Sequence, residues 1–268
     1  MDAHYAVIYT EKRKEAKEAA EYVKKLLSER GASVEIYSAT ELIGKKLPDA
    51  IDYLIALGGD GTILKSVQAL SDSETPILGI NFGHGGFLME VDSNLLEEAI
   101  RRLLDGKYHL EKVMMISATV GDEKISDALN EIYIASRSLG KTLEFSIYKK
   151  TELAKITADG LIISTPIGST AYAYSAGGPI VDDELEAVVL VPVCPLTHSR
   201  PLVLSLKEKI KIDIFSEYGV QILIDGFVKR NFEERSMQIT VEKSENAVNF
   251  VRLGLGESFV RRVKKKLG

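Results

Sequence analysis

The chain has 268 residues, enough for one large domain or two small ones, and its 45% hydrophobic and 27% charged residues are ordinary for a globular protein. Its formal net charge of −5 argues against a general nucleic-acid-binding surface, and the basic segment at residues 261–266 is interpreted as a solvated helix end. One cysteine excludes an internal disulfide, no apolar run reaches the roughly 20 residues of a membrane helix, and no signal-peptide pattern is present. We therefore expect a cytoplasmic protein without nucleic-acid or membrane partners.

The first hundred residues alternate between strand and helix patterns. We expect strands at residues 4–9, 33–37, 51–57 and 76–80, and helices at residues 11–30, 39–43, 63–70 and 95–104. This alternation predicts a parallel sheet covered by helices, with right-handed crossovers and with ligands at the carboxyl ends of the strands. Gly31 and Gly106 are expected to end their helices, and Asp92 or Ser93 to cap the helix at residues 95–104.

From residue 108 onward, short β-rich runs follow one another between turn residues. They lie at residues 110–120, 127–136, 143–149, 153–157, 161–164, 188–193, 209–215, 220–224, 237–241 and 249–252. We predict an α/β domain with a parallel sheet over residues 1–100, followed by a predominantly antiparallel β domain, a sandwich or an irregular stack, over residues 101–254. Residues 258–267 have a helical pattern, so the segment 255–268 can return to the first domain.

A glycine-rich turn joins the third strand to the following helix. Its residues are Gly58, Gly59, Asp60, Gly61 and Thr62. Glycine lets a phosphate approach backbone N–H groups closely, and the helix start adds a partial positive charge. The Asp60 carboxylate would repel a phosphate unless it holds a metal ion or takes a proton from an attacking hydroxyl, and both uses belong to phosphoryl transfer. The alternative is that Gly and Asp act here only as turn formers. A second glycine-rich loop, residues 81–88, is expected to face this turn.

The pair Asn130–Glu131 interrupts an apolar run. Burying a carboxamide beside a carboxylate is costly without partners, and adjacent strand residues face opposite sides, so the pair is predicted at a strand end or a bulge. There both side chains can reach one ligand, because Glu131 accepts hydrogen bonds from a sugar diol and Asn130 can both donate to and accept from a base edge. The alternative is a strand with one exposed polar side.

The stretch at residues 159–178 is an apolar strand followed by a loop dense in Ser, Thr and Gly. Closely spaced hydroxyls and N–H groups suit a ligand with many oxygens, and Tyr172 can stack on a ring. A flexible loop is the alternative. The four histidines lack metal-ligand spacing, and His84, among glycines, is more often structural than a ligand contact. Cys194 is interpreted as a core residue, and the P-loop motif is absent.

Three elements in this order and spacing resemble one known family. They are Gly58–Thr62, Asn130–Glu131, and the run from Asp159 that contains Ser-Thr-Pro-Ile-Gly-Ser-Thr-Ala-Tyr. On these residues the chain is similar to the NAD kinase family, with archaeal-like features, over most of its length. The Gly-Gly-Asp-Gly element alone is shared with diacylglycerol and sphingosine kinases, whereas the other two elements are more restrictive. The resemblance implies phosphorylation of the adenosine 2′-hydroxyl of NAD by ATP or polyphosphate to give NADP, with Mg²⁺ or another divalent metal as cofactor.

The resemblance also implies roles for individual residues. Asp60 matches the catalytic aspartate, and the donor phosphates would be held by Gly58, Gly59, Gly61 and Thr62. The residues implied in substrate binding are Gly61, Lys65, Phe87, Asn130, Glu131, Lys141, Asp159, Thr170, Ala171, Tyr172 and Ser175. Asp159 matches an aspartate that reaches the nicotinamide end across a subunit contact, which implies a homodimer or homotetramer with shared sites. No residue is assigned as a metal ligand.

Three positions depart from the family pattern. Ile167 replaces a hydroxyl residue, Phe227 stands where glutamine is common, and Gly85 follows His84 where leucine is usual. None of these changes touches Asp60, so they bear on affinity and selectivity more than on the reaction. A lipid or sugar kinase that shares only the glycine turn, and a non-catalytic dinucleotide-binding regulator, stay open as alternatives. The sequence does not decide between ATP and polyphosphate or between NAD and NADH.

Overall fold

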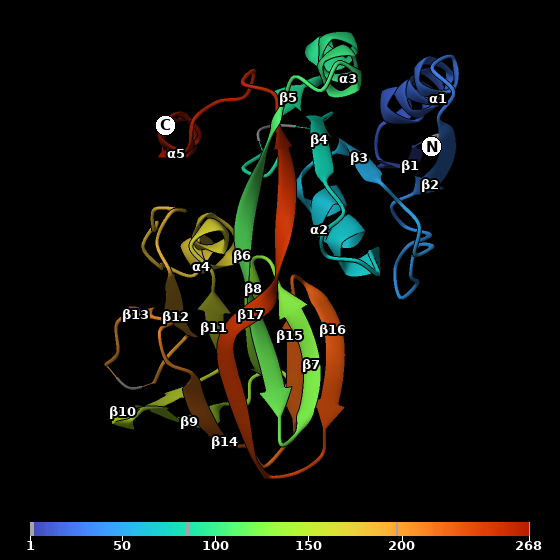
Figure 1. Ribbon diagram of the computed structural model, residues 1–268. Coiled ribbons are helices and arrows are strands. Elements are labelled where there is room, and N and C mark those ends of the chain that lie inside the picture. The colour runs from blue at the N-terminus through green and yellow to red at the C-terminus, as the bar shows by residue number, and fades with distance from the viewer. Residues whose placement is uncertain (1–2, 84–85, 197, 268) are drawn as a thin grey trace. The chain divides into compact units, whose positions relative to one another are not determined.

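A computed structural model describes residues 3–83, 86–196 and 198–267 of the chain, so His84 lies outside the described residues (Figure 1). The chain divides into two compact units. The first unit consists of residues 1–113 and 247–268, and the second consists of residues 114–246. Each unit has its own hydrophobic core. Among the described residues, no helix has the length and apolar character needed to span a bilayer.

The first unit is built on the predicted parallel sheet. Its strands are β1 (His4–Tyr9), β2 (Ser33–Ser38), β3 (Tyr53–Gly58), β4 (Ile77–Asn81) and β5 (Val91–Asp92). Its helices are α1 (Lys14–Ser28), α2 (Asp60–Ala69), the 3-10 helix η1 (Ser93–Leu95), α3 (Leu96–Leu104) and α5 (Phe259–Leu267). Strands β2, β1, β3 and β4 are neighbours in that order and run parallel, and Phe250 of β17 (Ser236–Arg252) pairs with Ile77 on the outer side of β4.

Helices α1 and α3 cover one face of this sheet, and α2 lies on the other (Figure 1). Buried aliphatic side chains of α1 and α3 pack on β1, β3 and β4, and the Tyr22 hydroxyl of α1 donates to Glu97 of α3 at 2.6 Å. Because the strands are parallel, the loops that follow β1, β3 and β4 emerge at the same edge of the sheet. This edge carries the glycine turn.

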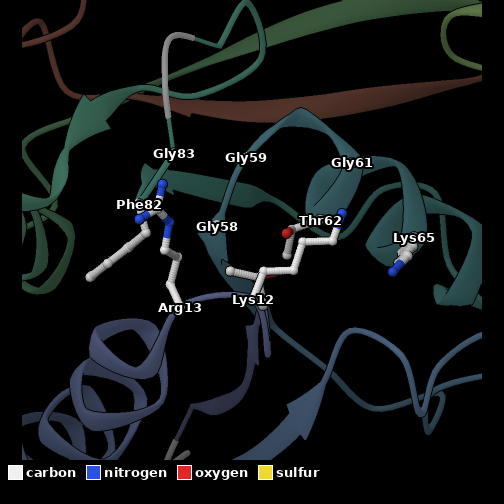
Figure 2. A pocket seen from close by; sticks show the side chains of 10 residues that line it. Lys12, Arg13, Gly58, Gly59, Gly61, Thr62, Lys65, Phe82 and Gly83 are labelled. Carbon is white, nitrogen blue, oxygen red and sulfur yellow. The ribbon is translucent and has the colours of Figure 1, made fainter.

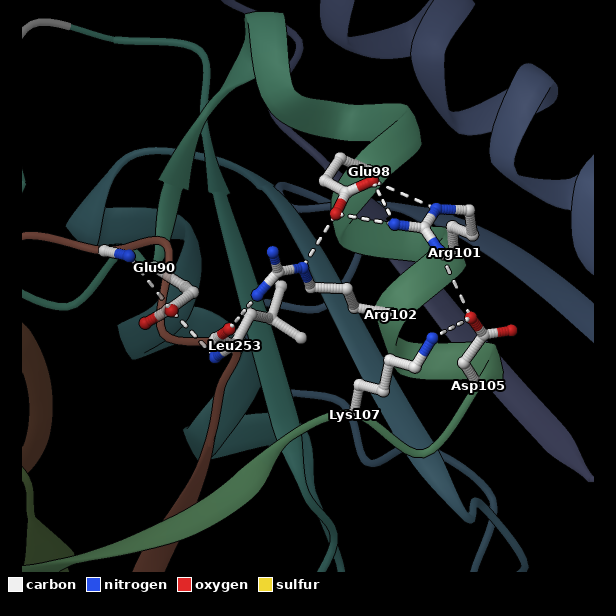
Figure 3. A network of polar contacts seen from close by, with 8 residues as sticks. Glu90, Glu98, Arg101, Arg102, Asp105, Lys107 and Leu253 are labelled. Carbon is white, nitrogen blue, oxygen red and sulfur yellow. Dashed lines mark hydrogen bonds and ion pairs between the residues drawn. The ribbon is translucent and has the colours of Figure 1, made fainter.

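A polar network anchors the end of β17 in the first unit (Figure 3). The buried Glu90 carboxylate accepts the backbone N–H of Leu253 at 2.8 Å and that of Gly256 at 3.3 Å. From α3, Arg102 donates to the Leu253 carbonyl at 2.8 Å. Glu90 also forms an ion pair with the largely buried Arg252 at 3.3 Å. The end of β17 and the segment that follows it therefore belong to the first unit.

The second unit packs two antiparallel sheets face to face. One sheet contains the hairpin of β6 (His109–Val120) with β7 (Glu123–Ala128), and β10 (Thr151–Ala158), β9 (Leu143–Lys149), β14 (Ile210–Phe215) and β17. The other contains, in order, β13 (Leu202–Ser205), β12 (Ala187–Val193), β11 (Gly160–Ser164), β8 (Glu131–Ser136), β15 (Val220–Ile224) and β16 (Phe227–Phe232). Aliphatic side chains of both sheets form one buried cluster with Phe145. The predicted antiparallel β architecture is confirmed.

Several local predictions were wrong. Residues 39–44 form turns, because Ser38 and Glu41 exchange hydrogen bonds between side chain and backbone. Asp92 does not cap the following helix, since its carboxylate accepts a hydrogen bond from the Asn81 amide at 2.9 Å. Cys194 is exposed with a φ of +47°, because β12 ends at Val193 and the chain turns there.

Strand lengths also differ from the prediction in the second unit. The run at residues 127–136 is split between β7 and β8, and the runs at 237–241 and 249–252 belong to the single long strand β17. Strands β13 and β16 were not predicted. Both are edge strands, and neither sequence, Leu-Val-Leu-Ser or Phe-Val-Lys-Arg-Asn-Phe, alternates polar and apolar residues, so the pattern of a half-buried strand is missing.

Candidate active site

A pocket of about 330 Å³ opens in the first unit beside the glycine turn (Figure 2). Its lining residues are Thr10, Lys12, Arg13, Gly58, Gly59, Gly61, Thr62, Lys65, Phe82 and Gly83. Lys12 and Arg13 come from the loop after β1, and Lys65 comes from α2. Three cations and no carboxylate occur among these lining residues, so the pocket favours an anionic ligand.

The glycines of the turn have two different roles. A Cβ at Gly58 would lie 2.1 Å from Thr62 Oγ1, so packing requires glycine there. At Gly59 and Gly61, a Cβ would meet nothing within 4 Å, and neither residue has a positive φ. The fold therefore does not require glycine at these two positions. Their missing side chains leave space beside the N-terminus of α2, where backbone N–H groups and the helix dipole favour phosphate.

The half-buried Asp60 carboxylate holds the second glycine-rich loop. Its Oδ2 accepts the backbone N–H of Phe87 at 2.9 Å, and its Oδ1 accepts that of Leu88 at 3.0 Å. A Cβ at Gly86 would lie 2.7 Å from Asp60 Oδ1, so this loop approaches the carboxylate too closely for a side chain. The prediction that the two loops face each other is confirmed. Backbone donors thus offset the negative charge that Asp60 brings to the turn.

In the second unit, Glu131 is the first residue of β8 and Asn130 precedes it, so the predicted strand end is confirmed. Both residues are buried. Asp225, in the turn between β15 and β16, accepts backbone N–H bonds from Leu129 at 2.9 Å, Asn130 at 2.7 Å and Glu131 at 3.1 Å. Asp225 was not predicted as a site residue. The Asp225–Gly226 dipeptide between two strands was a turn signal that could have drawn attention to it.

The hydroxyl-rich loop packs directly on the Asn130–Glu131 pair. Thr165 Oγ1 donates to the Leu129 carbonyl at 2.6 Å and accepts the Gly168 N–H at 3.0 Å. A Cβ at Gly168 would lie 2.1 Å from the Asn130 carbonyl oxygen. Thr170, which ends the 3-10 helix η2 (Ile167–Thr170), is buried with a relative exposure of 3%. The alternative of a flexible loop is therefore wrong.

Glu131 has an unusual electrostatic environment. Its relative exposure is 6%, and its Oε2 atom is buried without a hydrogen-bond partner in the described part of the chain. Burial, and after it the negative charge of Asp225, raise the pKa of Glu131 to about 8. A buried carboxyl group of this kind is common where a ligand binds.

Tyr172 and Asp159 lie near a second tyrosine, Tyr133. The half-exposed Tyr172, the first residue of α4 (Tyr172–Ser175), contacts Tyr133 edge to face, with ring centroids 5.3 Å apart. Burial, and then Tyr172, raise the pKa of Tyr133 to about 12, and the Asp159 charge adds to this shift. Gly160 leaves room for the Tyr133 ring, because a Cβ there would lie 2.5 Å from Tyr133 Cε2. Tyr133 was not predicted as part of this cluster.

The remaining predicted residues of the second unit lie in two places. Ala171 precedes α4 and the exposed Ser175 ends it, so both lie beside Tyr172. Lys141 is in the turn after β8, and its ammonium group lies 4.8 Å from the centroid of the Tyr218 ring. Glu131 is the first residue of β8, and Lys141 follows the end of that strand. At a rise of about 3.3 Å per residue, β8 is about 17 Å long, so its length separates Lys141 from the Asn130–Glu131 pair.

Comparison with known proteins decides the family. The family model described as the ATP-NAD kinase N-terminal domain matches residues 3–108, and that of the ATP-NAD kinase C-terminal domain matches residues 129–253. A protein of Methanothermobacter thermautotrophicus named NAD kinase is 39% identical, with 94% of this chain and 92% of the relative covered. The chain belongs to the NAD kinase family. This is a family of phosphotransferases. A second relative named NAD kinase, from Thermococcus sibiricus, is 40% identical, and the match covers 86% of this chain and 84% of the relative.

Solved structures of an NAD kinase and of an NADH kinase share the fold. The crystal structure of an NAD kinase from Archaeoglobus fulgidus in complex with ATP is 30% identical, with a TM-score of 0.76 and 98% of both chains covered. The structure of yeast NADH kinase complexed with NADH has a TM-score of 0.83 and 24% identity, and covers 100% of this chain and 88% of its own. The α/β and antiparallel β architecture is therefore that of the NAD kinase family.

Three lining residues of the pocket in the first unit, Thr10, Lys12 and Arg13, were not predicted. Phe82 and Gly83 belong to the second glycine-rich loop, which was expected to face the turn. The three unpredicted residues follow β1 closely. Since parallel strands end at one edge, the polar residues after this strand could have been grouped with the glycine turn.

Proposed function

We propose that the chain transfers a phosphoryl group from ATP to the 2′-hydroxyl of the adenosine ribose of NAD and so forms NADP. The observation that carries this proposal is the cationic pocket beside the glycine turn, where Gly59 and Gly61 leave space that the fold does not require. Donor phosphates would bind there to backbone N–H groups at the start of α2, with Lys12, Arg13 and Lys65 as counter-charges. Gly58 and Thr62 shape this turn through their close contact.

Asp60 is proposed as the general base. The two backbone N–H bonds orient its carboxylate, which is proposed to accept the proton of the attacking hydroxyl. Phe87 is proposed to pack beside the substrate, since its backbone is fixed to Asp60. A positioned base of this kind contributes on the order of 10²–10⁴ to the rate.

The second unit is proposed to bind the dinucleotide. Asn130 and Glu131 would hold the adenosine and its ribose, supported by the loop that packs on them. The further residues proposed to contact the substrate are Lys141, Asp159, Thr170, Ala171, Tyr172 and Ser175. The exposed ring of Tyr172 is available for stacking.

Mg²⁺ is proposed as the cofactor. Among the described residues, no group of three or more His, Cys, Asp or Glu side chains could hold a metal ion. Magnesium in phosphoryl-transfer enzymes is usually bound by one or two carboxylates together with substrate phosphates. No carboxylate is among the lining residues of the pocket, so the donor phosphates would supply the ligands of the ion, and Asp60 keeps its proposed role as base. When bound, the ion would neutralise negative charge on the phosphates.

One incubation tests the proposed function. NAD, ATP and Mg²⁺ are mixed with the protein, and NADP is measured with a dehydrogenase that accepts only NADP. NADP formation is expected, and a parallel reaction with polyphosphate shows whether that donor is also used. NAD binding without NADP formation from either donor would instead support a dinucleotide-binding regulator. Phosphorylation of a lipid or a sugar without NADP formation would support the other kinase classes.

We also propose a homodimer or homotetramer in the cytoplasm. Asp159 lies near Tyr133 and the exposed Tyr172, and this position suits contact with a substrate that is shared between subunits. Multi-angle light scattering of the purified protein measures the subunit number, and a monomer at working concentration would contradict the shared site. Cell fractionation tests the location.

A further inference from the structure

Asp225 and Glu131 are two buried acidic residues connected through the backbone. The Asp225 carboxylate, with a relative exposure of 3%, accepts three consecutive N–H bonds, including that of Glu131 at 3.1 Å. In return, the Asp225 N–H donates to the Glu131 carbonyl at 3.0 Å. Three N–H donors favour an ionised Asp225. The turn between β15 and β16 therefore fixes a negative charge close to the start of β8.

Among the residues that the structure describes, Glu131 has no comparable set of donors. Its buried Oε2 lacks a partner, and its register neighbour on β11, Ser164, directs its hydroxyl to the carbonyls of Asn130 and Thr165. The causes acting on the Glu131 pKa, which lies at about 8, are burial and the charge of Asp225, and both oppose ionisation. Neither cause involves a cation. At neutral pH the three N–H donors favour the ionised form of Asp225, while burial and that negative charge favour the neutral form of Glu131.

We propose that Asp225 is a positioning residue that fixes the Asn130–Glu131 turn and keeps Glu131 as a neutral carboxylic acid, so that Glu131 donates a hydrogen bond to an acceptor atom of the bound dinucleotide. This inference rests on the proposed function, because it assumes that the dinucleotide occupies the site of this pair. A protonated carboxyl group can donate and accept, whereas a carboxylate only accepts. A neutral Glu131 also avoids placing a second negative charge next to an anionic dinucleotide.

The inference predicts that NAD affinity depends on pH. When only the protonated form of Glu131 binds, the dissociation constant for NAD rises as Glu131 loses its proton, by up to about tenfold per pH unit above its pKa. Removing the negative charge of Asp225 makes ionisation of Glu131 easier. The rise in the dissociation constant then begins at a lower pH.

The test measures NAD binding by calorimetry without a phosphoryl donor, from about pH 6.5 to about pH 9.5. Five proteins are compared: the wild type, Glu131→Gln, Asp225→Asn, Asp225→Ser and Glu123→Gln. Gln at position 131 cannot titrate, Asn or Ser at 225 keeps an acceptor without the charge, and the exposed Glu123 on β7 is the matched control. Circular dichroism checks that each variant folds.

The expected result is a rise in the wild-type dissociation constant of tenfold or more over this range. The rise should be unchanged in Glu123→Gln, absent in Glu131→Gln, and displaced to lower pH in whichever Asp225 variant folds. An infrared carboxylic-acid band at neutral pH that is missing in Glu131→Gln would give a readout independent of binding.

Three results would overturn the inference. A flat wild-type profile with normal NADP formation would show that Glu131 is not the donor, while leaving the proposed function intact. A rise that persists in Glu131→Gln would assign the titration to another group. If the NAD dissociation constant of the Asp225 variants depended on pH as it does in the wild type, Asp225 would not control the ionisation of Glu131. Absence of both NAD binding and NADP formation would instead reject the proposed function, and this inference with it.

Discussion

The Phe87 backbone N–H donates to Asp60 Oδ2 at 2.9 Å, so the proposed base also fastens the second glycine-rich loop. The neighbouring Leu88 N–H donates to the other oxygen at 3.0 Å. Asp60 therefore combines an acceptor role in the fold with a proton-accepting role in the proposed reaction. These two roles can be separated by experiment.

For Asp60→Asn we expect kcat to fall by about 10²–10⁴, because an amide cannot take the hydroxyl proton. Asn keeps an oxygen for one of the two backbone N–H groups, so the dissociation constant for NAD should change little. NADP formation and calorimetric binding measure the two effects. Asp72→Asn, in an exposed turn of the same unit, is the control. An unchanged kcat in Asp60→Asn would mean that another group is the base.

For Gly61→Ala we expect the fold to be kept and the KM for ATP to rise. The added methyl group meets no protein atom within 4 Å but projects into space proposed for phosphate. Overpacking by about 1–3 kcal/mol corresponds to roughly 5- to 150-fold in KM. Alanine also favours a helix more than glycine does, so the free energy of unfolding should not fall.

Gly58→Ala is the matched comparison, because its methyl group would lie 2.1 Å from Thr62 Oγ1. This variant should lose about 1–3 kcal/mol of stability in urea unfolding. If Gly61→Ala lost stability while its KM for ATP stayed at the wild-type value, the phosphate assignment of this turn would be wrong.

For Lys12→Met we expect the KM for ATP to rise by roughly 10- to 150-fold, with a smaller change in the KM for NAD. Lys12 lines the cationic pocket, and a charge-assisted hydrogen bond to phosphate is worth about 1.5–3 kcal/mol. Lys14→Met is the control, because Lys14 is highly exposed and pairs with Glu18. Steady-state kinetics at two salt concentrations measures the effect. Equal shifts in both KM values would argue against a donor-specific role.

For Thr165→Val we expect weaker NAD binding and a loss of about 1–3 kcal/mol of stability. The valine removes the hydroxyl that joins the Leu129 carbonyl to the Gly168 N–H, and it leaves both groups buried without this partner. Thr165→Ser keeps the hydroxyl and should restore most of both losses. Urea unfolding and calorimetry give the two quantities. NAD affinity unaltered in Thr165→Val would indicate that this loop does not support the binding pair.

Much of the fold was predictable because its signals are local. The strand at His4–Tyr9 and the turns at Gly31 and Gly106 follow from apolar runs and from the positive φ that glycine adopts easily. The strand end at Glu131 followed from the cost of burying two polar side chains together. Asp92 failed as a helix cap because the nearby Asn81 competes for its carboxylate, and this contact depends on how β4 and β5 pair.

The sequence by itself determined the classes of secondary structure, the glycine turn and the motifs of the NAD kinase family, since these depend on residues close together in the chain. Only the tertiary structure brought Lys12 and Arg13 to that turn and Asp225 beneath Asn130 and Glu131. The reason is physical, because a pocket or a shifted pKa depends on which distant groups are buried side by side. Adjacent positions in a sequence do not specify those partners.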